Sequence, residues 1–101
     1  MVVVIEPTQN SAYIEDIDST SGEAVVGSAC VVWDVTVISD GGAAGVVTFH
    51  NGDDQTDAKL LEVKVAASGT QHLPLPRGKR FSTGLFVKSN VAGLDLAIDY
   101  D

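Results

Sequence analysis

A chain of 101 residues has the length of one domain, and with 45% hydrophobic residues it can bury a core without disulfides. Its single cysteine, Cys30, excludes an internal disulfide and lies in an apolar run typical of a buried side chain. The formal net charge of −8 argues against nucleic acid as a ligand, and no apolar run is long enough to span a membrane.

The first residues are predicted to form a strand or an extended arm. Val2 to Glu6 are mostly β-branched and stop at Pro7, and Ala12 to Ile17 follow as a second strand-like segment. No basic region or cleavage site of a secretory signal is visible here, so we expect synthesis in the cytoplasm. We divide this single domain into an N-terminal strand or arm, residues 1–17, and a β-sandwich, residues 18–101.

The clearest strand is predicted from Ala29 to Ser39. Strict alternation places Val31, Trp33, Val35 and Val37 on one apolar face, which we expect to point into the core. Trp33 is the only tryptophan and is predicted to anchor that core.

The middle of the chain is predicted to continue as strands joined by tight turns. Val46 to Asn51 forms a partner strand, and Asn51-Gly52 is a strong turn signal. Ala58 to Ala67 alternates as a strand, although its Ala, Lys, Leu and Glu residues also suit a helix. We prefer the strand because the second half of the segment is β-branched.

Near the C-terminus, Phe81 to Ser89 is predicted to form a strand with Phe81 and Leu85 as core anchors. Phe86 falls on the opposite, polar face and is a candidate interface anchor. Gly93 to Asp101 alternates almost perfectly as a last strand. Seven or eight short strands predict an all-β fold, an antiparallel β-sandwich for which jelly-roll connections are one option.

A basic cluster, Arg77, Lys79 and Arg80, stands out in this acidic sequence. It lies in a predicted loop, Pro76 to Arg80, that follows a short edge-type segment, Gln71 to Leu75. Such a cluster can pair with carboxylates on a neighbouring protein. The alternative is a solvated turn.

No constellation predicts an enzyme, a cofactor or a metal site. His50 and His72 have no ligand partner nearby in the sequence, and no nucleophile with a base is evident. The acidic loop containing Asp53, Asp54 and Asp57 has calcium-like content, but it lacks the spacing of a calcium-binding loop. We expect solvation there.

The C-terminal half resembles small virion proteins of tailed bacteriophages. The matching pieces are the Asn51-Gly52 turn, an aliphatic strand, a Gly-Thr turn, the Leu73 to Pro76 segment, Phe81 to Val87, and a final strand ending in Tyr100 and an acid. The resemblance implies a β-sandwich decoration (cement) protein on the outer capsid surface. It implies the major capsid protein as partner and frequent three-fold self-assembly. From the net charge and the lack of a long apolar run, we expect neither nucleic acid nor a membrane as a partner.

In such a protein, we expect Phe86 and the basic cluster to contact neighbours, and Val2 and Val4 to belong to an arm that adds as a strand. Two alternatives stay open. The first is a tail, head-to-tail adaptor or fibre-base component. The second is a calcium- or carbohydrate-binding β-sandwich module.

Overall fold

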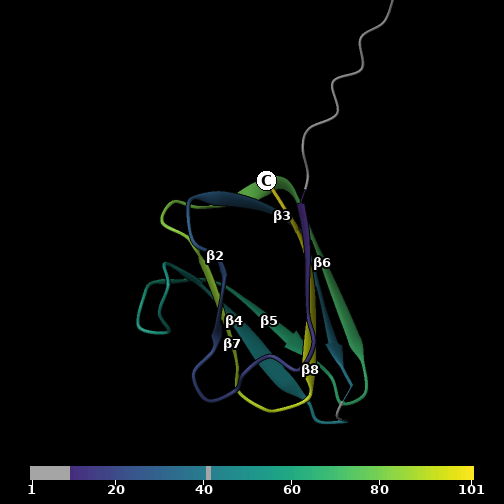
Figure 1. The fold of residues 1–101 in the computed structure, drawn as a ribbon. Coiled ribbons are helices and arrows are strands. Elements are labelled where there is room, and N and C mark those ends of the chain that lie inside the picture. The colour runs from purple at the N-terminus through teal and green to yellow at the C-terminus, as the bar shows by residue number, and fades with distance from the viewer. Residues whose placement is uncertain (1–9, 41) are drawn as a thin grey trace, which may run out of the picture.

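The computed structural model describes residues 10–40 and 42–101 and consists of two four-stranded antiparallel sheets that face one another (Figure 1). One sheet has the order β1-β8-β3-β6 and the other β2-β7-β4-β5. This is the strand order of a jelly roll, so the predicted all-β sandwich is confirmed. The strands are β1 (Asn10–Ile14), β2 (Glu23–Val26), β3 (Cys30–Ser39), β4 (Gly45–Asn51), β5 (Lys59–Val65), β6 (Thr70–Phe81), β7 (Leu85–Ser89) and β8 (Leu94–Tyr100).

The core lies between the sheets, where period-two alternation buries one side of each strand. The largest fully buried side chains include Phe49, Phe81, Ile17, Leu85, Leu94 and Leu96. Two of the three predicted core anchors, Phe81 and Leu85, are 0% exposed. Within the described ranges, no helix is long and apolar enough to cross a membrane.

A β-bulge in β3 overturns the predicted role of Trp33. On the neighbouring strand, Tyr100 pairs with Val32 and Asp99 with Asp34, so Trp33 has no register partner there. Val32 and Val35 are therefore both buried, while Trp33 and Asp34 both lie on the outer face. Trp33 is half-buried and lies outside the core cluster.

Strand β6 is longer than predicted. The expected edge segment, basic loop and first residue of the next strand form one strand, Thr70–Phe81. It is interrupted by an irregularity, because Pro74 pairs with Asp34 and Lys79 with Val32. Six residues of β6 thus lie opposite three of β3, and Gly78 adopts a positive φ of 72° at this point. The basic cluster therefore lies on a sheet edge and not on a separate loop.

Part of the predicted N-terminal arm belongs to the sandwich. Residues 10–14 form β1, which pairs along its whole length with β8. Val2 and Val4, and the first predicted strand around them, lie outside the described residues.

Candidate interaction site

Phe86 does not offer the exposed anchor that the sequence suggested. It points away from the core cluster but is only 6% exposed, because the turn before β2 covers it. A Cβ atom built on Gly22 of that turn would lie 2.5 Å from the Phe86 ring. The ring also meets His50 edge-on, with 6.1 Å between ring centroids. Phe86 is thus covered by its own chain and is unavailable to a partner.

Hydrogen bonds hold the covering turn in place. The carboxylate of Asp18 accepts backbone N–H bonds from Thr20 at 2.8 Å and Ser21 at 3.0 Å. The bond from Ser21, and after it the bond from Thr20, are the main causes that lower the pKa of Asp18 below its ordinary value. Lys88 of β7 donates from Nζ to the backbone oxygen of Ser19 at 3.0 Å, which ties the turn to the sheet. The turn is therefore built as a fixed cover.

The basic cluster Arg77, Lys79 and Arg80, called here the basic edge, lies on β6, a strand at the open edge of its sheet. Arg77 and Arg80 are exposed and Lys79 is half-buried. None of the three forms an ion pair with another described residue. The basic edge therefore presents uncompensated positive charge.

The same strand is poorly suited to pairing with another strand. Pro74 and Pro76 lack the N–H groups that such pairing uses, and the irregularity opposite Trp33 bends the edge. Proline and charged side chains are common protections of an open sheet edge. A partner is therefore expected to contact side chains of the basic edge rather than extend the sheet at β6.

The outer face of the same sheet carries an open depression of about 350 Å³, called here the sheet-face depression. It is lined by Ser11, Ala12, Tyr13, Asp34, Thr36, Ala97, Ile98 and Asp99, from three neighbouring strands. In the register, Ala97 stands between Tyr13 and Thr36. The small side chain of Ala97 leaves a space between the bulkier side chains of Tyr13 and Thr36.

Two carboxylates face each other at the sheet-face depression. Asp34 of β3 and Asp99 of β8 are direct register partners. Ser11 donates from Oγ to Asp99 at 2.7 Å, and Nε2 of His72 is hydrogen-bonded to Asp34. Like charges directly opposite one another in a sheet are destabilising, so this pair is a feature that packing alone does not account for.

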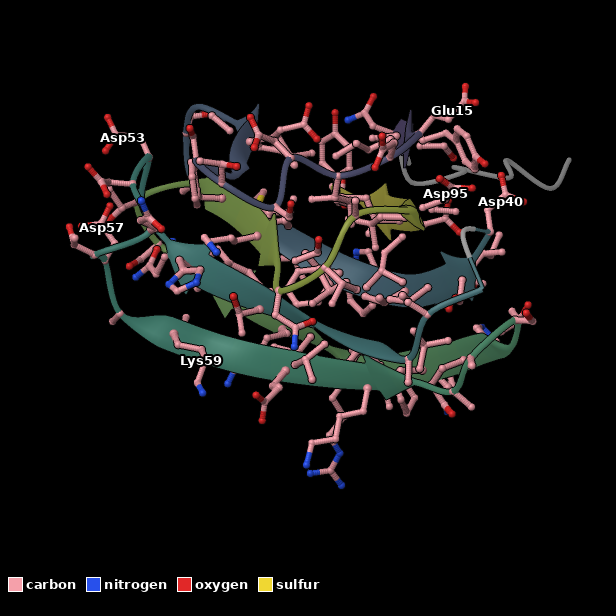
Figure 2. The ribbon with its side chains drawn as sticks, turned by 90° about the horizontal axis from the view of Figure 1, so that it is seen from below. Glu15, Asp40, Asp53, Asp57, Lys59 and Asp95 are labelled. Carbon is pink, nitrogen blue, oxygen red and sulfur yellow. The ribbon has the colours of Figure 1, made fainter. Side chains whose placement is uncertain are left out.

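An aromatic side chain, that of Tyr13, forms one wall of the sheet-face depression. Tyr13 is 60% exposed and is the only large hydrophobic side chain exposed among the described residues. Its hydroxyl donates to Oδ2 of Asp95 at 3.2 Å, and Oδ1 of Asp95 accepts from the backbone N–H of Asp16 at 2.8 Å. In Figure 2, Asp95 lies close to Glu15 and Asp40 at one end of the sandwich, while Asp53 and Asp57 lie at the other.

The pKa of Tyr13 is raised above its ordinary value of 10.0. Partial desolvation is the largest cause, and the charge and hydrogen bond of Asp95 add to it. The folded chain thus keeps the phenol proton at a pH where the unfolded chain loses it. The resulting stabilisation is complete below pH 10.0 and is lost as the pH rises through the folded pKa.

We expect the tyrosinate absorbance of a Tyr100→Phe variant, in which Tyr13 is the only tyrosine, to report a pKa above 10.0. Adding Asp95→Asn should bring that pKa closer to 10.0, because it removes the neighbouring charge. A titration of the folded chain at or below 10.0 would contradict the observed contact.

The acidic loop between β4 and β5 uses its carboxylates internally. Oδ2 of Asp57 accepts backbone N–H bonds from Asp53 and Asp54, and Oδ1 of Asp54 accepts one from Thr56. His50 contacts the same loop through Nδ1 and the backbone oxygen of Asp57 at 2.9 Å. Across residues 10–40 and 42–101, no group of three or more His, Cys, Asp or Glu side chains is placed to hold a metal ion.

The sequence interpretation did not find the sheet-face depression. It singled out neither Asp34 nor Asp99, and it considered His72 only as a metal ligand without a partner nearby in the sequence. Asp34 and Asp99 are both acidic residues on the outward-facing side of a strand, which the sequence does show. That they lie opposite one another follows only from the register between β3 and β8.

No protein-family model and no curated protein matches the chain. Among solved structures, the chain is similar to one of Bacillus endospore appendages, described as a novel family of disulfide-linked pili. The similarity covers 92% of this chain and 86% of that chain, at 13% identity and a TM-score of 0.49. At these values the likeness supports no conclusion about function.

Proposed function

We propose that the chain is a structural protein that decorates the outer surface of a tailed-phage capsid, where it assembles with copies of itself and bridges capsid subunits. The observation that carries this proposal is the basic edge, which presents three cationic side chains on a protein of net charge −8. Charge segregation of this kind orients a protein against an acidic partner surface.

The energetics fit a protein present in many copies. An exposed ion pair contributes about 0–1 kcal/mol, so a single basic edge orients a partner more than it holds it. Stabilisation then comes from mass action, because a protein that binds only the assembled shell shifts the equilibrium away from disassembly. The jelly-roll order also occurs in lectins and cupins, so the fold alone assigns no function. The resemblance of the C-terminal half to small virion proteins supplies the choice of a phage shell.

The test is to count copies of the chain in purified particles and to rebind the protein to particles stripped of it. We expect a copy number comparable with that of capsid subunits, and stripped shells that dissociate at a lower temperature until the protein is restored. The triple variant Arg77→Gln/Lys79→Gln/Arg80→Gln should rebind at least tenfold more weakly. Lys59→Gln/Lys64→Gln, on the exposed side of β5, is the control and should rebind nearly as wild type.

Absence of the chain from purified particles, or unchanged shell stability after stripping, contradicts the proposal. A few copies per particle would support a tail, adaptor or fibre-base component instead.

A further inference from the structure

We propose that the sheet-face depression receives an arginine side chain from the basic edge of a neighbouring copy of this chain. This inference rests on the self-assembly part of the proposed function and names the two surfaces that meet. The charges, the aromatic wall and the distribution of free cations carry it.

The carboxylate pair favours a cationic guest. Asp34 and Asp99 are direct cross-strand partners, and the Cβ atoms of such partners in an antiparallel sheet stand about 4.5–5.5 Å apart. Ionised carboxylates only accept hydrogen bonds, and the single contacts from His72 to Asp34 and from Ser11 to Asp99 leave acceptor positions on both, so the guest must be a donor. A positive guest relieves their mutual repulsion, a neutral polyol leaves it in place, and an anion adds to it.

The aromatic wall favours a guanidinium over an ammonium group. Tyr13 has a mostly exposed ring, and the bond of its hydroxyl to Asp95 fixes that ring beside the small Ala97. Asp95 is only 5% exposed and is held in turn by the backbone of Asp16, so the wall is rigid. A guanidinium group stacks its plane on an aromatic face and binds carboxylates through two parallel bonds, whereas an ammonium group acts on both as a point charge.

The distribution of cations indicates a second copy as the source of this arginine. Lys59 is paired with Glu62, and Lys88 is bonded to backbone oxygens within its own chain. Lys64 is exposed but offers an ammonium group. The basic edge, by contrast, has exposed arginines without an ion pair among the described residues. The chain thus carries both a cation acceptor and free guanidinium groups.

The donor and the acceptor are different residues of one protomer, so two arrangements satisfy the contact. In a two-fold dimer it forms twice, reciprocally, and in a head-to-tail arrangement it forms once per interface and gives a closed ring or a filament. The net charge of −8 opposes association at long range, but at physiological ionic strength charges beyond about 8 Å are largely screened. The short-range contact of the arginine with the two carboxylates therefore decides whether copies of the chain associate.

The experiment measures self-association of the purified full chain by sedimentation velocity at physiological ionic strength. The acceptor variant is Asp34→Asn/Asp99→Asn, and the donor variant is Arg77→Gln/Arg80→Gln. We expect wild type to form oligomers and each variant alone to associate at least tenfold more weakly. An equimolar mixture of the two variants retains one intact contact and should form dimers.

Charge-matched controls separate this contact from general electrostatics. Asp53→Asn/Asp54→Asn changes the net charge as the acceptor variant does, in the exposed loop at the opposite end of the sandwich from Asp95 (Figure 2). Lys59→Gln/Lys64→Gln matches the donor variant. Both controls should associate as wild type, and circular dichroism should show that all variants are folded.

Three results would overturn the inference: a wild-type chain that stays monomeric at millimolar concentration, variants that associate as wild type, or a mixture that forms no dimer. A monomeric chain that binds a neutral oligosaccharide would identify the depression as a saccharide site instead. These outcomes are independent of particle counts. If particles contain many copies of the chain but the variants associate as wild type, only this inference is contradicted. If the mixed variants form dimers but the chain is absent from particles, only the proposal of capsid decoration is contradicted.

Discussion

Replacing Phe81 by alanine is expected to lower the free energy of unfolding by about 3–5 kcal/mol, which is a large part of the stability of a small domain. Phe81 is 0% exposed and lies at the end of β6, where it pairs in register with the buried Cys30. Its removal leaves a cavity that the two sheets cannot close without breaking strand pairing. Urea unfolding followed by circular dichroism measures the change.

The informative comparison is Trp33→Ala. Tryptophan is larger than phenylalanine, but Trp33 lies half-buried on the outer face, so its loss should cost clearly less than the loss of Phe81. Equal costs would place Trp33 in the core after all. Phe81→Leu, which leaves a smaller cavity, provides a measurable variant if Phe81→Ala does not fold.

Replacing Gly22 by valine should be almost as damaging, at about 2–5 kcal/mol. Gly22 has a φ of 75°, which a β-branched residue tolerates badly. A Cβ atom there would also lie 2.5 Å from the Phe86 ring and 2.7 Å from the backbone oxygen of Val87. We expect the turn to lift from the sheet, so binding of a hydrophobic dye should increase as Phe86 becomes exposed.

Gly27→Ala is the matched control, because a Cβ atom at Gly27 meets nothing within 4 Å and its φ is not in the left-handed region. We expect a change of about 0.5 kcal/mol or less. If both substitutions lower the free energy of unfolding by similar amounts, the contact between the turn and Phe86 does not explain the effect at Gly22.

The alternation of apolar residues was sufficient to predict the fold class, because burial between two sheets imposes period two on each strand. Leu94, Leu96 and Ile98 in β8 follow this rule without interruption and are buried as expected. The rule failed at Trp33, because a bulge shifts the phase of a strand by one residue. A bulge is fixed by pairing with distant strands, so nothing in the local alternation marks it.

Prediction of the candidate site from the sequence required long-range strand pairing even more than prediction of the fold did. Arg77, Lys79 and Arg80 could be singled out because adjacent charges stand out in the sequence itself. The partnership of Asp34 with Asp99 exists only through the β3–β8 register. Phe86 failed as an anchor for a related reason, since its cover comes from residues more than sixty positions away.

The placement of β1 has a consequence for biosynthesis. Asn10 pairs with Tyr100, so the outermost strand of one sheet joins a strand that is far from it in the sequence. β1 has no partner until β8 has been synthesised, and such distant pairings slow folding compared with helical domains of equal length. Until β8 has left the ribosome, this sheet stays incomplete, and the nascent chain is then most exposed to aggregation and most in need of chaperones.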